Sequence, residues 1–214
     1  AASREHIFLS DSSLKHVLLY DRRGRFVKTF AEGQLERPTG LAFDQASRRL
    51  YVADTAAHQV LIYREDGQLE QSIGRRGTGK GEFNYPTHLW LDGNGSLLVV
   101  DSLNYRVQIF RPDGVFVAEF GRQGDSSGEF ASPKGIAADR HGHVFVVDAL
   151  FDTVQIFDRQ GQLLLNFGER GTSPGQFWLP AGIFVDENDR IYVADSYNQR
   201  VQVFEFLGGP GSGD

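Results

Sequence analysis

Two residue types in this sequence have the chemistry for a metal site: a recurring aspartate and a few histidines. The aspartates that close equivalent apolar segments are Asp44, Asp92, Asp139 and Asp186. Carboxylate oxygens gathered around one centre are ligands that Ca²⁺ prefers. Each of these aspartates, however, is followed directly by a polar turn sequence such as GNGS or ENDR. We therefore interpret them as turn caps, because an aspartate side chain readily accepts hydrogen bonds from the backbone just after it.

The histidines do not converge on one place in the pattern. A zinc site takes three or four ligands, yet only His88 lies within one of these apolar segments. The equivalent positions of the other segments hold Gly40, Gly135 and Gly182. The sequence also contains no G-x-S-x-G nucleophile elbow, because the stretches GDSSG and GTSPG are not followed by a predicted helix, and it contains no P-loop or H-E-x-x-H motif. It therefore predicts no catalytic residue, no metal site and no cofactor.

Composition excludes several further classes of protein. The 214 residues carry a formal net charge of −6 and contain no cysteine and no methionine. Disulfides and thiolate metal sites are thus ruled out. No apolar run reaches the roughly 18–20 residues that span a bilayer, so no membrane span is expected. An acidic chain without a Lys/Arg block also argues against a nucleic-acid partner, because such binding neutralises phosphates.

The chain repeats one unit five times. An aspartate ends the same short apolar segment in every unit, at Asp11, Asp54, Asp101, Asp148 and Asp195, with spacings of 43, 47, 47 and 47 residues. A proline recurs at Pro38, Pro86, Pro133 and Pro180. Each unit reads as four short strands rich in β-branched and aromatic residues. Glycines between the third and fourth strands indicate hairpins: Gly24, Gly67, Gly114 and Gly161. Such units predict an all-β fold, a β-propeller of four-stranded antiparallel blades.

The segments Val193–Phe204 and Val100–Phe110 resemble the NHL repeat, and the resemblance extends over Ile7 to Leu207. It is closest to bacterial six-bladed NHL-repeat propellers, some of which occur in cell-envelope systems alongside multihaem cytochromes. The resemblance implies an extracytoplasmic protein, periplasmic or at the cell surface. It also keeps an alternative open, because related propellers include zinc-dependent lyases and calcium-dependent hydrolases whose ligands surround the central channel.

The strand count does not close a six-bladed ring. The first unit lacks its first strand and the last lacks its fourth, so the chain holds 18 strands where six blades need 24. We expect residues 1–207 to form a propeller with partial first and last blades, and residues 208–214 to form a Gly-rich flexible tail. The missing strands are expected upstream of Ala1, since the sequence has no methionine start. A partner that supplies them, or an open ring, is the alternative.

Motif residues have structural roles in this interpretation. Asp101 and Asp195 are expected to accept backbone hydrogen bonds in their turns. Asn104 suits a left-handed turn position, and Asn198 is its equivalent. Arg106, like Arg200, is expected to pair with a buried carboxylate or with carbonyls between blades. Phe83, Phe130 and Phe177 are expected to fold inward beneath their loops.

Because the strands alternate in direction, we expect two kinds of loop to lie on the same rim of the propeller disc, which we call the loop rim. The first kind, which we call the Asp turn, follows the aspartate that ends each second strand. The second kind, which we call the Pro loop, leads into the proline at the start of each first strand. Positions suited to polar residues hold apolar ones there: Leu103, Tyr105, Leu150, Phe151 and Tyr197, with Tyr85 and Trp178 just before prolines. The alternative for Trp178 is an inward loop staple.

Exposed aromatic loops mark binding surfaces. We therefore predict a non-enzymatic scaffold that binds another protein through these seven residues, with a multihaem c-type cytochrome or an envelope component as the partner. A sensor or carbohydrate-binding propeller is a third possibility, because Trp and Tyr also stack on sugars.

Overall fold

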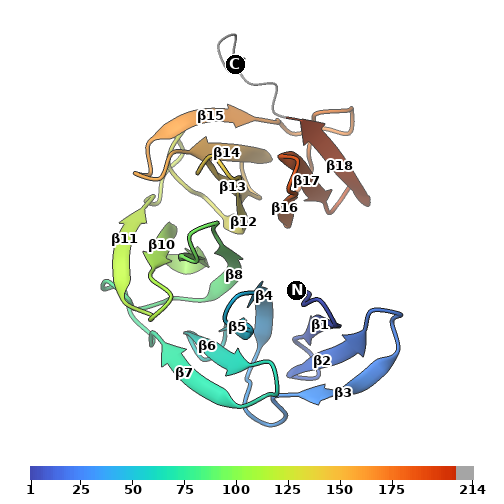
Figure 1. The fold of residues 1–214 in the computed structure, drawn as a ribbon. Helices are drawn as coiled ribbons and strands as arrows, with labels where there is room; N and C mark the ends of the chain where they lie inside the picture. The colour runs from blue at the N-terminus through green and yellow to red at the C-terminus, as the bar shows by residue number, and fades with distance from the viewer. Residues whose placement is uncertain (206–214) are drawn as a thin grey trace, which may run out of the picture.

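Five antiparallel sheets stand side by side around an axis in the computed structural model, which describes residues 1–205 (Figure 1). We number the sheets as blades 1 to 5 in chain order. Figure 1 shows the ring open between blade 1 and blade 5. The all-β propeller predicted from the repeats is confirmed. The predicted flexible tail, 208–214, lies outside the described residues, as do the last two residues of the predicted propeller.

Blades 2 to 4 each contain four strands, whereas three strands are described in blade 1 and three in blade 5. The strands of blade 1 are β1 (His6–Asp11), β2 (His16–Asp21) and β3 (Phe26–Phe30). Those of blade 2 are β4 (Pro38–Asp44), β5 (Arg49–Asp54), β6 (Gln59–Arg64) and β7 (Leu69–Ile73). Those of blade 3 are β8 (Pro86–Leu91), β9 (Leu97–Asp101), β10 (Arg106–Phe110) and β11 (Phe116–Phe120). Those of blade 4 are β12 (Pro133–Ala138), β13 (Val144–Asp148), β14 (Thr153–Phe157) and β15 (Leu163–Phe167). Those of blade 5 are β16 (Ile183–Val185), β17 (Arg190–Asp195) and β18 (Arg200–Glu205).

The first strands of the blades approach each other closely around the axis. β4 packs against β8, β8 against β12, and β12 against β16. Gly40 of β4 makes this possible, because a Cβ built at Gly40 would lie 2.7 Å from the Cα of His88 and from the carbonyl oxygen of Thr87. The close approach of β4 to β8 therefore requires a residue without a side chain at position 40.

Apolar clusters fill the spaces between successive blades. The cluster between blades 3 and 4, for example, combines Val100 and Val107 with Ile136 and Val146. Phe83, Phe130 and Phe177 are fully buried beneath the Pro loops, as the sequence predicts. Burial of both faces explains why the strands of the middle blades are near-continuous apolar runs.

The predicted count of 18 strands, with three in blade 1, is confirmed, and a single bridge extends the sheet of blade 1 beyond β1. Ala2 forms an antiparallel bridge with Ile7, and the N–H of Phe8 donates to the carbonyl of Ala1 at 2.8 Å. The Ser3 hydroxyl accepts from the amides of Glu5 and His6, as aspartates do after the other first strands. The chain therefore begins at the inner edge of blade 1. The repeat pattern did not reveal this bridge, because Ser3 stands where the other units have the aspartate that ends the first strand.

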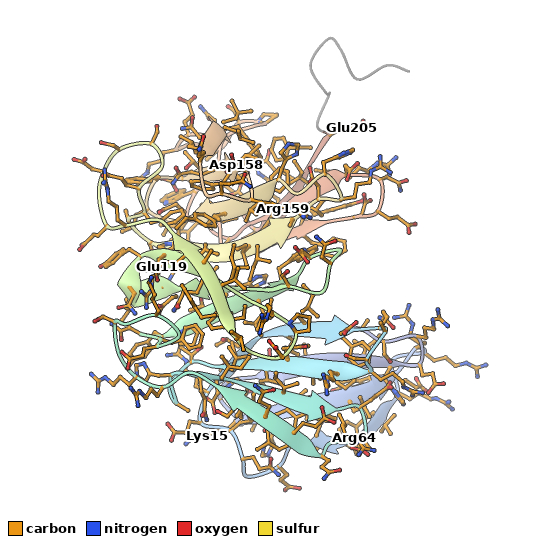
Figure 2. All side chains as sticks on the ribbon, turned by 60° about the vertical axis from the view of Figure 1, so that its left-hand side comes forward. Lys15, Arg64, Glu119, Asp158, Arg159 and Glu205 are labelled. Atoms are coloured by element: carbon orange, nitrogen blue, oxygen red, sulfur yellow. The ribbon has the colours of Figure 1, made fainter. Side chains whose placement is uncertain are left out.

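The outer faces of the two end blades are apolar and exposed. On blade 5, Phe184 pairs with Tyr192 and Tyr192 with Val203 across the sheet, so all three side chains share one face. Phe184 and Val203 are each more than half exposed. On blade 1, Leu9 of β1 is equally exposed. Figure 2 shows the side chains from the side, with Glu205 at the end of β18.

Within residues 1–205, no helix is both long and apolar enough to cross a bilayer.

Candidate functional site: the loop rim

The recurring aspartate of each second strand joins the Asp turn to the Pro loop beside it. Asp54 accepts from the amides of Glu36 and Arg37 at 2.9 and 2.7 Å. Asp148 likewise accepts from Ala131 and Ser132. The sequence predicted that Asp101 and Asp195 accept from backbone amides of their own turns. This is wrong for both, because the backbone amides that donate to them are those of Asn84 and Trp178 in the Pro loops. The structure shows that, in blades 2 to 5, the recurring carboxylate holds the neighbouring loop.

Arg106 joins the Asp turn of blade 3 to the Pro loop beside it through four hydrogen bonds. Its guanidinium donates to Asp101 at 2.9 Å, to Glu119 at 2.7 Å, and to the carbonyls of Gly79 and Glu82 at 2.8 and 2.9 Å. The prediction that it binds a buried carboxylate and loop carbonyls is confirmed. Five donors in a rigid fork suit such a crowded site.

Arg200 repeats the arrangement in blade 5. It donates to Asp195 at 2.8 Å and to the carbonyls of Thr172, Ser173 and Gln176, each at 2.8 Å. Its side chain is 30% exposed, whereas that of Arg106 is 10% exposed. The motif is thus more open to solvent in the end blade.

The two carboxylates of this motif respond differently to their surroundings. Burial raises the pKa of Asp101, even though Asn84, Asn104 and Arg106 donate hydrogen bonds to it. Burial acts in the same direction on Asp195, but donors that include Arg200 outweigh it, so the pKa of Asp195 is lowered. The difference follows from the lighter desolvation of blade 5 at the open end of the ring.

The predicted backbone role of Asn104 is wrong. The left-handed residue is Tyr105, with φ of 54°, and in blade 5 it is Gln199 rather than Asn198. Asn104 instead donates through its side-chain amide to the Asp101 carboxylate and the Gly77 carbonyl. Asparagine suits this position because its side-chain amide can reach the Pro loop, and not because asparagine tolerates a positive φ.

An apolar surface covers the loop rim of blades 3 to 5. The second residue after the recurring aspartate is Leu103, Leu150 or Tyr197 in these blades, exposed by 50%, 64% and 62%. The same position holds Ser13 and Ala56 in blades 1 and 2. The Asp turns of three consecutive blades therefore expose a large apolar side chain at this position, and in blade 1 the next residue, Leu14, is 58% exposed.

Trp178 extends this surface from the Pro loop of blade 5. Its ring stacks on that of Tyr197, with centroids 5.5 Å apart and planes at 29°. The guanidinium of Arg170 lies 5.5 Å from the centre of the Trp178 ring. The N–H of Tyr197 donates to the carbonyl of Trp178 at 3.1 Å. The inward alternative for Trp178 is wrong, because the side chain is a partly exposed member of an aromatic stack.

Of the remaining predicted residues, Tyr105 and Phe151 are less accessible, whereas Tyr85 is as exposed as Trp178. Tyr105 and Phe151 are half-buried, and Tyr105 packs against the cluster between blades 3 and 4. Tyr85 is 37% exposed, and its ring meets that of His58 at 4.7 Å. The seven residues therefore share one rim, but they do not contribute equally to its outer surface.

Two residues that sequence reasoning missed hold the Pro loops across blades. His58 Nδ1 accepts from the amide of Tyr85 at 3.2 Å, and an Asp152 carboxylate oxygen accepts from Leu179 at 2.7 Å. Both acceptors are left-handed residues of Asp turns, with φ of 55°. Tyr85 and Leu179 also have positive φ although each precedes a proline. The repeat alignment offered a signal, since a polar side chain stands at the same turn position in both.

The strand-ending aspartates cap turns, as predicted. Asp92 Oδ1 accepts from the amides of Asn94 and Ser96 at 2.9 and 2.8 Å. Asp186 accepts from Asn188 and Arg190 in the same way. These oxygens are engaged by the backbone of their own turns rather than gathered around the axis.

A cavity of about 480 Å³ lies at the axis, lined by Thr39, Thr87, His88 and Lys134 among others. His88 Nδ1 accepts from the amide of Ile136 at 3.2 Å. Burial, with a smaller contribution from the nearby amino terminus of Ala1, lowers the pKa of His88 to about 4. Among the residues that line this cavity, His88 is the one histidine. Its imidazole is neutral, and one of its two ring nitrogens already accepts a hydrogen bond.

The structure also brings together three potential metal ligands that the sequence did not single out, Glu5, His6 and Glu65. Arg48 pairs with Glu65 at 2.6 Å and lies 3.9 Å from Glu5. A cation already neutralises this cluster, so it does not support a metal site.

We expect the depressed pKa of His88 to make stability fall in mild acid. The unfolded chain takes up the His88 proton near pH 6.5, whereas the folded chain does so near pH 4. The free energy of unfolding should therefore fall between these values by up to about 3 kcal/mol. Urea titrations across this range should show that His88→Gln, which keeps an acceptor for Ile136, removes this part of the pH dependence. A His88 ring that titrates near pH 6.5 by NMR would contradict the expectation.

Comparison with known proteins supports the repeat assignment. A family model described as NHL repeat matches residues 177–204, and one described as a 6-bladed beta-propeller matches residues 43–97. No curated protein matches the sequence.

Similar solved structures include a gluconolactonase from Xanthomonas campestris, with 21% identity and a TM-score of 0.72 over 94% of this chain and 68% of that one. A streptogramin B lyase has 12% identity and a TM-score of 0.69, over 95% of this chain. A virginiamycin B lyase from Staphylococcus aureus has 13% identity and a TM-score of 0.67 over 95% of this chain and 67% of that one. The chain spans 66% of the streptogramin B lyase, so the similarity concerns the fold and covers only part of these proteins.

Proposed function

We propose that this β-propeller, whose residues 177–204 match the NHL repeat, is a non-enzymatic scaffold whose loop rim binds a protein partner. Its repeat motifs are scaffold residues that carry no reaction of their own. The observation that carries the proposal is the apolar arc formed by Leu103, Leu150, Trp178 and Tyr197 over three consecutive blades. Trp and Tyr, represented here by Trp178 and Tyr197, are among the usual anchors of protein interfaces. These side chains are exposed on loops and not buried in the core, and exposed apolar side chains that gather on a surface indicate a binding site.

The charges of the rim favour a protein over a nucleic acid. Arg75 pairs with Glu82 at 2.9 Å, and Arg122 pairs with Glu129 at 2.8 Å. Arg170 lies over the Trp178 ring. Cations that are neutralised within their own loops offer little to a phosphate backbone.

The rim is also held in position before a partner arrives. Buried aspartates, Arg106 and Arg200 tie each Asp turn to the Pro loop beside it. A surface that is ordered in advance loses less conformational entropy on binding, which favours affinity.

The partner class follows from the resemblance to bacterial envelope propellers. We place the protein outside the cytoplasm, in the periplasm or at the cell surface, with a multihaem c-type cytochrome or another envelope component as its partner. The support is the NHL repeat itself and the apolar rim.

The test is affinity capture from cells that naturally make the protein. We expect the combined variant Leu103→Ser, Leu150→Ser and Tyr197→Ser to capture at least tenfold less of the partner. The three side chains are at least half exposed, so the unfolding midpoint should hardly change. A matched variant on the opposite rim, Arg159→Ser with Gln160→Ser, should capture as much as the natural chain. Equal capture by both variants would contradict the proposal.

We further propose that these blades belong to a six-bladed ring. The family model for residues 43–97 describes six blades, and the described residues supply 18 of the 24 strands that six blades need. The exposed apolar faces of blades 1 and 5 are the surfaces that such a ring would cover.

A metal-dependent lyase or hydrolase with a site in the central channel is the second candidate. It is favoured by the axial cavity, which contains His88. Metal analysis of the purified protein separates the two candidates, because stoichiometric zinc or calcium that depends on His88 supports the enzyme and its absence supports the scaffold.

A further inference from the structure

We propose that a pocket between blades 3 and 4 binds a small aliphatic carboxylate, with a branched apolar body of about four to six carbons. The body lies against the apolar walls of the pocket, and the carboxylate pairs with the guanidinium of Arg159. Every residue that lines this pocket belongs to blade 3 or blade 4, which both have four strands. The site is separate from the loop rim, and the inference does not depend on the proposed function.

The pocket combines apolar walls with polar residues from turns. Its volume is about 160 Å³, and it is lined by Leu98 of β9 and Val144 of β13, which are 2% and 3% exposed. Asn94 and Arg159 also line it, from turns of the rim opposite the loop rim. Arg159, labelled in Figure 2, has a side chain that is 46% exposed. A cavity of about 150 Å³ with apolar walls holds a benzene-sized molecule, so this volume suits a body of that size.

The pocket is present because side chains that fill the other interfaces are replaced here by smaller ones. Ala118, the third residue of β11, corresponds to larger residues in the other fourth strands: Lys28, Gln71 and Leu165. Lys28 and Gln71 each reach the following blade, where they donate to the carbonyls of Asp66 and Asp113, both at 3.0 Å. The methyl group of Ala118 is too short to make this contact, and space remains between blades 3 and 4.

Leu98 and Ala138 are also small for their positions in the repeat. Aromatic residues stand three residues before the recurring aspartate in three other units: Phe8, Tyr51 and Phe145. Larger residues also stand at the sixth position from the recurring proline, where blade 4 has Ala138: Phe43, Leu91 and Val185. These six residues pack into the interfaces between blades 1 and 2, 2 and 3, and 4 and 5. The interface between blades 3 and 4 therefore has the least side-chain volume at these positions.

An ion pair covers the equivalent surface of blade 2. Ser96 and Val117 line the pocket, and their equivalents in blade 2 are Arg49 and Glu70. The Arg49 guanidinium pairs with the Glu70 carboxylate at 2.6 Å. A serine and a valine at these positions leave the surface of blade 3 accessible to a ligand.

Arg159 supplies the positive charge of the site. Gly142 allows the Arg159 side chain to lie over the turn, because a Cβ at position 142 would collide with the guanidinium. Asn94, with its amide oxygen facing Arg159, accepts from the two terminal nitrogens of the guanidinium at 2.7 and 3.2 Å. A guanidinium has five N–H donors, so donors remain for a ligand carboxylate, whose geometry the guanidinium fork matches.

Asp92 limits the charge that the ligand can carry. Its Oδ1 atom accepts from amides of its own turn, and its Oδ2 atom lies 3.9 Å from Arg159, beyond hydrogen-bond distance. This carboxylate repels a second negative charge in the pocket. A singly charged carboxylate is therefore a better ligand than a doubly charged phosphate.

The test is an NMR titration of the full 214-residue chain with isovalerate and, separately, with isoamyl alcohol, which has the same branched body and no charge. We expect isovalerate to cause saturable shifts in the methyl signals of Leu98, Ile109 and Val144, which line the pocket. The alcohol should bind at least fivefold more weakly, because it does not pair with the guanidinium.

Two pairs of variants separate the charge of the site from its volume. Arg159→Gln should weaken isovalerate binding at least fivefold and leave the affinity for the alcohol unchanged, whereas Arg111→Gln, in an exposed turn of blade 3, should change neither. Ala118→Gln introduces the residue that blade 2 has at this position, so the fold should tolerate it, and it should weaken both ligands at least tenfold. Ala118→Ser is its matched control and should bind as the natural chain does.

Three results would overturn the proposal. The first is equal affinity for the acid and the alcohol, because Arg159 would then contribute nothing. The second is undiminished binding by Ala118→Gln, because the ligand would then lie outside the pocket. The third is a set of shifts confined to the loop rim around Arg170 and Trp178, because the carboxylate would then bind at a different arginine.

Discussion

Alanine at Gly40 or at Gly135 is expected to destabilise the propeller by about 3 kcal/mol or more, because an added Cβ overpacks the contact between neighbouring blades. At Gly40 the Cβ would meet the backbone of Thr87 and His88 at 2.7 Å. At Gly135 it would lie 2.6 Å from the carbonyl oxygen of Ala181. Neither glycine has positive φ, so the expected cost comes from the clash between strands rather than from backbone strain.

Gly182 is the matched control within the same repeat. A Cβ built there would meet only the Cβ of Ala194, at an ordinary 3.5 Å. Gly182→Ala should therefore change the free energy of unfolding by less than about 1 kcal/mol. Urea denaturation of the three variants measures the difference. A loss at Gly182 as large as that at Gly40 would mean that another strand packs against β16 and that the ring is not open there.

Arg106→Ala is expected to cost about 3–5 kcal/mol, because removal of one partner from a buried ion pair leaves the other charge uncompensated. The Asp101 carboxylate would lose its charged donor, and the carbonyls of Gly79 and Glu82 would lose the hydrogen bonds from Arg106. Burial already raises the pKa of Asp101. Without Arg106 that pKa should rise further, so the loss of stability should shrink as the pH falls and Asp101 takes up a proton.

Two variants calibrate the Arg106 result. Arg200→Ala should cost less, because Arg200 is three times as exposed. Arg111→Ala removes an exposed ion pair with Asp113 and should cost less than 1 kcal/mol. Chemical denaturation at pH 7 and pH 5 gives all three values. A cost at Arg106 no larger than that at Arg111 would show that the buried network does not hold the Pro loop.

The architecture was predictable from the sequence because its signals are local and repeated. Glycines such as Gly114 and Gly161 mark the hairpins, and both have the positive φ that those turns need. The aspartates after the first strands, such as Asp92, predicted capped turns, because an Asx turn depends only on the next few residues. Because the same unit recurs at a fixed spacing in the sequence, each unit was expected to bury its apolar faces against its neighbours.

Features that depend on contacts between units were harder to predict. The roles of His58 and Asp152 arise only when an Asp turn meets the Pro loop of the next blade. The position of Ala2 beside Ile7 was missed because Ser3 replaces the aspartate that marks the other units.

The candidate site was predicted in part. Alternation of strand direction places Asp turns and Pro loops on one rim, and the structure has them there. Exposure could not be read from the sequence, because it depends on how each turn packs. Leu150 points to solvent, whereas the adjacent Phe151 is half-buried. The aromatic stack of Trp178 on Tyr197 joins residues from two loops, so neither loop alone predicts it.

Site-specific photo-crosslinking tests most directly whether the loop rim is the binding surface. A photoreactive residue replaces Leu150 on the loop rim in one sample and Gln160 on the opposite rim in another. Both positions are exposed, so neither replacement should disturb the blades. The account predicts one covalent protein adduct from position 150, lost when Leu103→Ser and Tyr197→Ser are added, and none from position 160. Adducts from position 160 alone, or an adduct from position 150 that persists in the doubly substituted chain, would contradict it.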